Sequence, residues 1–468
     1  MLVYRVLQWL LRVATRVFFR RIEIVGLGNV PADGAVLFCG NHPNSLLDPI
    51  LITAHCGRIV HFAAKETLFE SPLVAFLLRR MGAVPVRRRS DHDGAPPPVP
   101  DPAATSAAPL DNDAAFAALH QVLLDGRAVG IFPEGLSHLD SQLAPLKTGA
   151  ARIALAVARK APGTKVLLIP TGLVYLTRHR FRSSVLIQFG APVEVKEPVD
   201  DPADPDGRTA ARELTAQIDA RLRALTVNAD SWDTIWVLDG VRRLYQPPGL
   251  TLEERVELAR RFNVAYPQAA HHADVRELLG RVRAYLTRMS AAGLSDHILR
   301  RELGVRDTVA RVIGHLGLLL FWLPLSLLGA PIHLPLGLAF RYIGRWTSPR
   351  KDTMATTKFL LGFMTMLLVY AGLAGLVGWK LGLGAGLLTA LVLPLSGWAF
   401  VHVIGRVDAL RHLVLTLVRV LRLRREVAAL RAERARLVTD VVAAVDRHRP
   451  ADMIPKFGPR RDAGPPTP

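Results

Sequence analysis

The sequence predicts an α/β domain, built on a mixed but mostly parallel sheet flanked by helices, followed by a helical membrane region at the carboxy-terminal end. Between residues 35 and 195, short apolar runs alternate with stretches of helical periodicity, which is the pattern of strands connected by helices. Between residues 314 and 403 the chain is strongly apolar, and two stretches approach the roughly 20 residues that a helix needs to cross a bilayer. A chain of 468 residues has room for both regions.

Net charge and cysteine content indicate the surroundings of the protein. Lys and Arg number 59 against 40 Asp and Glu, which gives a net charge of +19, yet half of the residues are hydrophobic. A chain that is both basic and apolar favours an anionic membrane surface over nucleic acid as its partner. The two cysteines, Cys39 and Cys56, are too few for a disulfide framework and lack metal-ligand spacing. We therefore expect a reducing, cytosolic surrounding and no metal site.

Residues 1–25 are expected to form an amphipathic helix. Polar residues, mostly arginines, recur at steps of three or four from Arg5 to Arg20 and leave apolar positions, Trp9 among them, for the other side. The arginines interrupt any apolar core of the length that a signal peptide needs, so we expect this segment to be retained. The pattern suits a helix lying in the lipid interface. The alternative is a helix packed on its own domain.

Residues 26–225 are expected to hold the α/β domain. Ser71 and Pro72 supply an N-cap and a proline at the first position of one of its helices. Residues 89–113, rich in Gly, Pro, Ala, Ser and Asp, are expected to form a flexible surface insertion without catalytic residues. The strands are predicted at 35–39, 58–63, 83–86, 128–132, 165–169 and 185–189, and the helices at 71–80, 112–125 and 148–160.

A helical extension is predicted at 226–312, and the membrane region follows at 313–405. Residues 359–378 and 381–403 are predicted to be true spans, whereas three prolines interrupt 315–340. Basic residues fill 341–358 and the stretch after 403, and both should face the cytoplasm. If the α/β domain is cytoplasmic too, 315–340 must enter and leave on one side. We therefore favour a re-entrant or interfacial hairpin there over a single kinked span.

The end of the chain has two further parts. Residues 406–446 have a long basic helical pattern, which predicts an amphipathic helix lying along the membrane, with pairing to another helix as the alternative. Residues 447–468 are Pro-rich and are expected to be disordered.

A His and an Asp follow the first predicted strand, six positions apart. A strand that ends in the polar turn containing His42 and Asp48 can expose a base together with its orienting carboxylate. On one regular helix a separation of six leaves two side chains about 120° apart, so at least one of them must lie outside it. We expect His42 near a helix cap, Pro43 at the first helical position, and Asp48 reaching back from the next turn. Taken alone, the pair also fits a structural turn.

Three further clusters follow later strands. Glu134 and Gly135 come after the strand at 128–132, where a carboxylate and a permissive backbone suit a substrate-binding turn. Arg87 comes just after the strand at 83–86, where a guanidinium can hold a phosphate with two hydrogen bonds. Residues 169–172, Ile-Pro-Thr-Gly, are expected to end another strand with a turn. Each cluster alone also fits an ordinary turn or a solvated basic end.

In their order, these clusters resemble the four blocks of the phospholipid/glycerol acyltransferase (PlsC-type) family. The resemblance covers roughly residues 26–225, and four motifs in the right order make it specific. Most members have four residues between the His and the Asp, whereas five lie between His42 and Asp48. The longer form resembles the fungal-type glycerol-3-phosphate/dihydroxyacetone-phosphate acyltransferase subgroup. The hydrophobic region after the domain, and the segment from Lys351-Asp352 to Ala355-Thr356, are also similar to that subgroup.

The resemblance implies a glycerolipid acyltransferase fold and a role for each matched residue. His42 would be the general base that takes the proton of the acceptor hydroxyl, and Asp48 would orient it and stabilise its charge. Arg87 would bind the acceptor phosphate, while Glu134 and Gly135 would shape the acceptor site. No covalent acyl-enzyme is implied. Asn41 and Ser45 are further substrate-binding candidates, and the secondary candidates are Lys65, Ser137 and Lys147.

The function implied is transfer of a fatty acyl group to the sn-1 hydroxyl of glycerol-3-phosphate or dihydroxyacetone phosphate, an early step of phospholipid synthesis. The donor would be acyl-CoA or an acyl carrier protein thioester, and we expect no cofactor. The protein would sit in a membrane rich in anionic lipid, with its catalytic domain facing the cytoplasm. The sequence makes no prediction of oligomeric state.

The alternatives fall into three classes. Within the same class, the acceptor would be lysophosphatidic acid or another lysophospholipid. A non-catalytic membrane scaffold is disfavoured because His42, Asp48, Arg87 and Glu134 are all present. A Ser-His-Asp hydrolase is disfavoured because the sequence has no Gly-x-Ser-x-Gly elbow.

Overall fold

The structure is a computed structural model, which describes residues 2–87, 112–197, 204, 207–300, 305–346 and 353–448. The chain divides into two compact units. The first comprises Met1–Thr226 and Arg350–Thr356, and the second comprises Val227–Pro349 and Thr357–Pro468. Most of the predicted insertion at 89–113 and of the predicted disordered tail at 447–468 lies outside the described residues.

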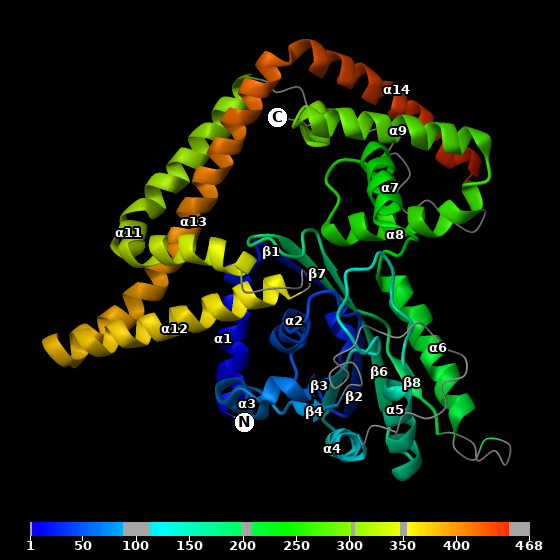
Figure 1. The fold of residues 1–468 in the computed structure, drawn as a ribbon, viewed down its shortest axis with the longest axis vertical. Helices are drawn as coiled ribbons and strands as arrows, with labels where there is room; N and C mark the ends of the chain where they lie inside the picture. The colour runs from blue at the N-terminus through cyan, green and yellow to red at the C-terminus, as the bar shows by residue number, and fades with distance from the viewer. Residues whose placement is uncertain are drawn as a thin grey trace. The chain divides into compact units, whose positions relative to one another are not determined.

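The first unit is built on a sheet of eight strands among the described residues (Figure 1). The strands are β1 (Arg21–Val25), β2 (Ala35–Gly40), β3 (Val60–Lys65), β4 (Val84–Val86), β5 (Ala128–Ile131), β6 (Val166–Tyr175), β7 (Ser184–Phe189) and β8 (Val193–Val195). Their order is β1-β7-β6-β2-β5-β3-β4, and β8 pairs with β6. Only the pairings of β6 with β7 and β8 are antiparallel. The predicted fold class, a mixed and mostly parallel sheet, is confirmed.

Helices cover both faces of this sheet. Successive residues of a strand point to opposite faces, and both faces of β2 are buried. Leu37, on one face, packs in a buried cluster with residues of the three helices that follow β4, β5 and β8. Phe38, on the opposite face, contacts the edge of the Phe189 ring. The helices are α1 (Leu2–Phe18), α2 (Leu47–His55), α3 (Pro72–Arg80), α4 (Asp113–Leu124), α5 (Gly149–Lys160) and α6 (Arg208–Leu225).

The helix α1 packs on its own unit and also exposes an apolar side. Leu11 and Phe18 are buried. Gln8 and Arg12, from the predicted polar side, donate hydrogen bonds to carbonyl groups of α2 at 2.7 and 2.8 Å. The exposed side carries Trp9 and other apolar residues. α1 is therefore packed on its own unit, as the alternative prediction has it. Its exposed apolar side is the kind of surface that an interfacial helix turns towards lipid.

The strand β6 is longer than the sequence predicts. We expect a turn at 169–172, but β6 continues through Pro170 to Tyr175, so that prediction is wrong. The carbonyl of Pro170 accepts from Gly190, so its missing N–H would point to the same side. On that side β8 pairs with residues 166–168 and β7 with residues 171–175, which leaves Pro170 between the two ladders. The proline therefore costs no ladder hydrogen bond.

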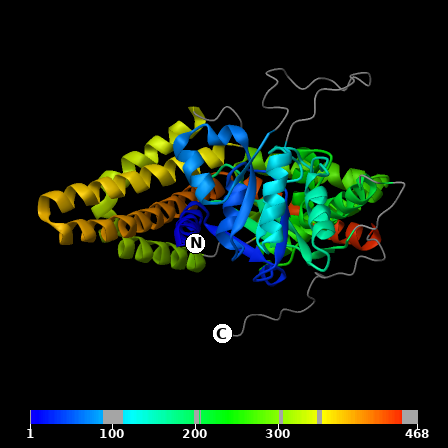
Figure 2. The same cartoon turned by 90° about the horizontal axis from the view of Figure 1, so that it is seen from below.

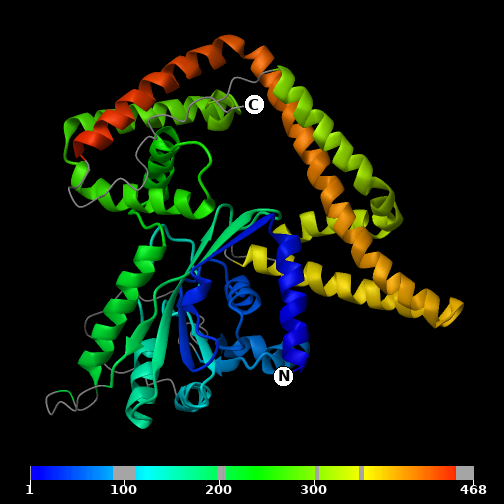
Figure 3. The ribbon, with the colours of Figure 1, turned by 180° about the vertical axis from the view of Figure 1, so that it is seen from behind.

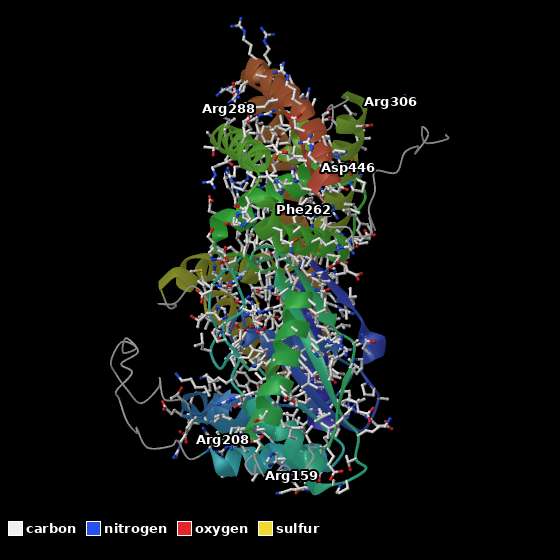
Figure 4. The ribbon with its side chains drawn as sticks, turned by 90° about the vertical axis from the view of Figure 1, so that its right-hand side faces the viewer. Arg159, Arg208, Phe262, Arg288, Arg306 and Asp446 are labelled. Atoms are coloured by element: carbon white, nitrogen blue, oxygen red, sulfur yellow. The ribbon has the colours of Figure 1, made fainter. Side chains whose placement is uncertain are left out.

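The second unit contains a helical cluster. Its helices are α7 (Trp232–Tyr245), α8 (Leu252–Ala269), α9 (Ala273–Ala291), α10 (Asp296–Arg300) and α14 (Arg424–His448). Leu430 and Leu437 of α14 are fully buried in the cluster that includes α7 and α9. Arg288 of α9, which Figure 4 labels, donates to Glu426 and Glu433 of α14. The prediction of one basic helix at 406–446 lying along the membrane is therefore wrong, because α14 buries its apolar side against other helices of this unit.

Among the described residues, three helices are long and apolar enough to cross a membrane: α11 (Val305–Trp346), α12 (Met354–Leu381, of which residues 354–356 belong to the first unit) and α13 (Leu383–Arg422). α11 runs beside α13, and Figure 2 shows the tight connection between α12 and α13. α11 is one continuous helix containing Pro324, Pro331 and Pro335, and its ribbon bends sharply in Figures 1 and 3. These prolines bend the helix without ending it, so 315–340 is one bent helix, and its entry and exit on one side of the membrane stay a prediction.

Candidate active site

The centre of the candidate site is the turn between β2 and α2. β2 ends at Gly40 and α2 begins at Leu47, so His42 lies in the connecting turn at the carboxyl edge of the sheet. The Nδ1 atom of His42 is 2.9 Å from Oδ2 of Asp48, in the first turn of α2. Asp48 is fully buried, and His42 is only 8% exposed. The expected place of Pro43 at the first helical position is wrong, because the helix begins four residues later.

The Asp48 carboxylate accepts two further hydrogen bonds. The Asn44 N–H donates to Oδ2 at 2.7 Å, and the Tyr175 hydroxyl donates to Oδ1 at 2.5 Å. These donors satisfy the oxygens of a carboxylate that is fully buried. Burial raises the pKa of Tyr175 well above its ordinary value, and the negative charge of Asp48 adds to this rise. Tyr175 therefore stays protonated and keeps donating.

The His42 ring is held on its face as well as at its edge. It stacks on Phe132, with ring centroids 4.1 Å apart and planes inclined by 9°. Gly40 makes room for this stack, since a Cβ there would lie 2.9 Å from the Phe132 ring. The carboxylate of Asp48 holds a proton on Nδ1, which leaves Nε2 with the lone pair of a base. The arrangement can therefore take a proton at one defined atom.

Glu134 supports the catalytic turn from the next strand. Its side chain is almost fully buried, and it accepts from the His42 N–H at 2.7 Å and from the Ala144 N–H at 2.9 Å. It also pairs with His138, and this hydrogen bond raises the pKa of His138 above its ordinary value in spite of partial burial. Glu134 thus holds the backbone of His42 in place. The sequence predicts instead that Glu134 shapes the acceptor site.

Gly135 allows a lysine to approach this turn. Its φ angle is +75°, and a Cβ would lie 2.7 Å from the Nζ atom of Lys147. The Lys147 N–H also donates to the Pro133 carbonyl at 2.8 Å. Any side chain at position 135 would be strained and would displace the ammonium group. The structure thus brings together Gly135 and the secondary candidate Lys147.

The other residues predicted to bind substrate lie on different elements of the first unit. Both polar atoms of the Asn41 amide bond the backbone of Leu173, at 2.7 and 3.0 Å, so Asn41 joins the ends of β2 and β6. Ser45 lies in the catalytic turn with a φ of +50°, which non-glycine residues rarely adopt. Lys65 ends β3, and Ser137 lies in the segment that follows Glu134. The structure uses Asn41 for the fold instead of leaving its amide for a substrate.

Arg87, predicted to bind phosphate, lies at the edge of the sheet. It follows β4, three strands away from β2, which corresponds to about 14 Å at the usual strand spacing. Its Nε atom is 3.0 Å from Oε2 of Glu66, and both side chains are exposed. The Arg87 guanidinium is therefore paired with Glu66 at the edge strand of the sheet.

Arg178, which the sequence did not single out, lies in the hydrogen-bond network of the catalytic turn. Its carbonyl accepts from the Asn44 amide at 3.1 Å, and its Nη1 donates to the His138 carbonyl at 3.4 Å. Burial lowers the pKa of Arg178, while the negative charges of Asp48 and nearby groups oppose this effect. A half-buried guanidinium therefore lies close to the His42–Asp48 pair. The signal that could have found it is the apolar run at 173–175, which continues β6 past Gly172 and leaves Arg178 three residues beyond its end.

One group of side chains among the described residues has the spacing of metal ligands. His272, Asp274 and His448 of the second unit bring their ligand atoms within 4.8 Å of one another. Arg447 and His448 both bond the same oxygen of Asp274, and the bond from His448 is the main reason that the pKa of Asp274 falls to about 2. A guanidinium thus occupies the carboxylate that a metal would need. The group includes neither His42 nor Asp48.

Two family models match this chain. Residues 21–174 match the model described as acyltransferase, and residues 237–453 match the model described as glycerol-3-phosphate acyltransferase 2 C-terminal domain. Each of these two models covers less than half of the chain. The predicted resemblance to this family is thereby confirmed, and the second match confirms the resemblance to the fungal-type subgroup.

Individual proteins similar to this chain were also found. Glycerol-3-phosphate O-acyltransferase 2 of Saccharomyces cerevisiae is 26% identical, over 63% of this chain and 52% of its own length. The chain thus spans about half the length of that relative. 1-acyl-sn-glycerol-3-phosphate acyltransferase of Borreliella burgdorferi is 27% identical, over 37% of this chain and 59% of its own length. The solved structure of a 1-acyl-sn-glycerophosphate acyltransferase from Thermotoga maritima is 21% identical and covers 47% of this chain and 76% of its own, with a TM-score of 0.33.

Proposed function

We propose that this chain is a membrane-bound acyltransferase that moves a fatty acyl group from an acyl thioester to the sn-1 hydroxyl of glycerol-3-phosphate or dihydroxyacetone phosphate. The observation that carries the proposal is the buried His42–Asp48 pair, held at the carboxyl edge of a mostly parallel sheet in the part of the chain that matches the acyltransferase family. The match of residues 237–453 favours glycerol-3-phosphate over a lysophospholipid as acceptor.

The geometry supports direct transfer with general base catalysis. Nε2 of His42 takes the proton of the acceptor hydroxyl while the oxygen attacks the thioester carbonyl. Asp48 stabilises the imidazolium that forms, and the hydrogen bonds from Asn44 and Tyr175 keep the carboxylate in place. When the tetrahedral intermediate collapses, the carbon–sulfur bond breaks and His42 returns the proton to the leaving thiolate. The acyl group thus moves in one displacement, and no serine nucleophile is needed.

The acceptor phosphate calls for a cation near His42, and Arg178 has the best position. Its guanidinium bonds the carbonyl of His138, whose own N–H donates to the His42 carbonyl at 3.4 Å. Lys147, beside Gly135, is a second cation on the same edge of the sheet. Arg87 is the alternative that the family resemblance implies, but it lies three strands away and pairs with Glu66.

The acceptor assay tests this proposal. Membranes containing the protein are given labelled acyl-CoA or acyl carrier protein thioester with glycerol-3-phosphate, dihydroxyacetone phosphate or lysophosphatidic acid. We expect glycerol-3-phosphate or dihydroxyacetone phosphate to be preferred. Arg178→Ala should raise the KM for that acceptor by about 10- to 100-fold, the size of one charge-assisted hydrogen bond. Preference for lysophosphatidic acid would overturn the proposed acceptor. If KM rose in the control Arg87→Ala and not in Arg178→Ala, Arg87 would be the residue that binds the phosphate.

The packing of the second unit supports a membrane topology. α10, which precedes α11, is joined to α14, which follows α13, by an ion pair between Asp296 and Arg434 at 2.8 Å. Both ends of the membrane region therefore lie on one side of the bilayer. The linker between α6 and α7, residues 226–231, can extend to only about 20 Å, too short for a hydrocarbon core of about 30 Å. The first unit, which includes Thr356, therefore lies on that same side.

Within the proposal, α11 thus starts and ends on the side of the catalytic unit, and α12 and α13 cross the bilayer as a pair. The bend of α11 suits a helix that enters the membrane and returns (Figure 3). The arginines at 419–425 face the cytoplasm and attract anionic lipid. The connection between α12 and α13 lies on the opposite side.

Thiol labelling measures this topology. In Trp379→Cys the new thiol replaces a side chain that is 80% exposed near the α12–α13 connection, and in Arg425→Cys it lies at the start of α14. The native Cys39 and Cys56 are buried, so they give little background. A membrane-impermeant reagent added to intact cells should label Trp379→Cys and leave Arg425→Cys unlabelled until the cells are opened. Labelling of Arg425→Cys from outside would overturn the orientation.

A further inference from the structure

The start of the membrane helix α12 belongs to the catalytic unit. Residues 350–356 group with the first unit, although the rest of that unit ends at Thr226. Ala355 is fully buried, and Thr356 is only 6% exposed. Both residues lie in the first turn of α12, which begins at Met354. A buried threonine at this point needs partners for its hydroxyl group.

Thr356 finds both partners in the catalytic turn. Its hydroxyl donates to the Asn44 carbonyl at 2.9 Å and accepts from the Leu47 N–H at 3.2 Å. The Leu47 N–H also reaches the Asn44 carbonyl directly, at 3.2 Å. One hydroxyl group thus joins the two ends of the four-residue turn from Asn44 to Leu47. This turn lies between His42 and Asp48, where the spacing is one residue longer than in most members of the resembled family.

The turn requires such a closure because its backbone is strained. Ser45 has a φ of +50°, a strained region that residues other than glycine seldom occupy. Both flanks of the turn act on Asp48, because the Asn44 N–H bonds its carboxylate and Leu47 precedes it in α2. If the turn relaxed, the Asp48 carboxylate would move relative to the imidazole. A misplacement of about 1 Å at such a site can cost about 100-fold in rate.

We propose that Thr356 is a positioning residue of the acyl-transfer site, which clamps the strained turn and so holds Asp48 against His42. The expected effect on the rate of acyl transfer rests on the proposed function. The expected effect on the structure of the turn does not. It makes the first turn of a membrane helix part of the active site. The longer spacing between His42 and Asp48 therefore depends on a side chain from outside the amino-terminal α/β region.

Three variants of the full-length protein test the clamp. Thr356→Val keeps the shape of the side chain and removes both hydrogen bonds, whereas Thr356→Ser keeps the hydroxyl. The matched control is Thr389→Val, because the Thr389 hydroxyl bonds only the Ala385 carbonyl of its own helix in the described structure. We expect Thr356→Val to lower kcat by about 10- to 100-fold with a KM change below about 2-fold. Thr356→Ser and Thr389→Val should stay within about 2-fold of the wild type.

Relief of the strain gives a second, independent measurement. Glycine adopts a positive φ without cost, so the Ser45→Gly background needs the clamp less. The loss of kcat caused by Thr356→Val should shrink to below about 5-fold when it is measured against Ser45→Gly alone. An equal loss in both backgrounds, or a loss equally large in Thr356→Ser, would overturn the clamp.

Hydrogen exchange separates this inference from the proposed function. In Thr356→Val the amides of residues 44–48 should exchange at least about 10-fold faster than in the wild type, while Thr389→Val leaves them unchanged. This readout needs no turnover, so it stands even if no acceptor is acylated. Unchanged exchange in Thr356→Val would overturn the clamp whether or not the protein is an acyltransferase.

Discussion

Replacing His42 by Ala is expected to lower the rate of acyl transfer by about 10²- to 10⁴-fold, because it removes the group proposed to take the acceptor proton. Asp48 would keep its hydrogen bonds from Asn44 and Tyr175, so the fold should survive. The rate is measured with saturating acceptor and labelled acyl thioester, and folding is measured by thermal unfolding of the same preparations.

The matched control for this variant is His120→Ala. His120 lies on α4, and its Nε2 atom is buried without a hydrogen-bond partner in the described structure, so its removal breaks no such bond. His120→Ala should keep the wild-type rate. Full activity in His42→Ala would overturn the base role of His42, whereas a wild-type protein without acyl transfer would indicate a non-catalytic scaffold that keeps the same fold.

Replacing Glu134 by Ala is expected to lower both stability and activity. The change leaves the N–H groups of His42 and Ala144 buried without an acceptor, and it also removes the partner of His138. Each unsatisfied buried group costs about 1–3 kcal/mol, so we expect the free energy of unfolding to fall by about 2–4 kcal/mol. Because the backbone of His42 is then no longer held, kcat should fall by about 100-fold.

The contrast with Glu134→Gln separates support from substrate contact. Glutamine keeps one carbonyl oxygen that can accept from the His42 N–H, so most of the stability and rate should return. Denaturant unfolding and acyl transfer are measured on the same samples. If Glu134→Ala instead raised the KM for the acceptor and left stability unchanged, Glu134 would line the acceptor site, as the family resemblance implies.

Much of the α/β domain follows from local patterns in the sequence. Alternating apolar runs and helical periodicity predict most of the strands and helices close to their observed bounds, because burial on a sheet acts residue by residue along each strand. The short strands β1 and β8 carry too little apolar pattern, and they escape this reasoning. Pro170 leads to a wrong prediction of a turn, because whether a proline costs a hydrogen bond depends on which strands lie beside it.

The candidate site shows the same division. Tyr175 and Arg178 reach the catalytic edge because β6 continues to Tyr175. The strand predicted from the sequence ends at residue 169. Arg87 follows a strand at the correct edge of the sheet, but only the strand order places it three positions from β2. The pairing of α14 with α7 and α9 likewise depends on which apolar sides meet, and a single helical pattern does not specify its partner.

The sequence by itself determined the fold class, the two apolar helices at 359–378 and 381–403 and the turn containing His42 and Asp48, because periodicity and turn chemistry are properties of neighbouring residues. Only the tertiary structure decided what holds Asp48 in position. Its partner Tyr175 is 127 residues away in the chain, and the Thr356 hydroxyl that bonds Leu47 is 309 residues away from it. Hydrogen bonds of this range form only when the folded chain brings the two atoms within about 3 Å.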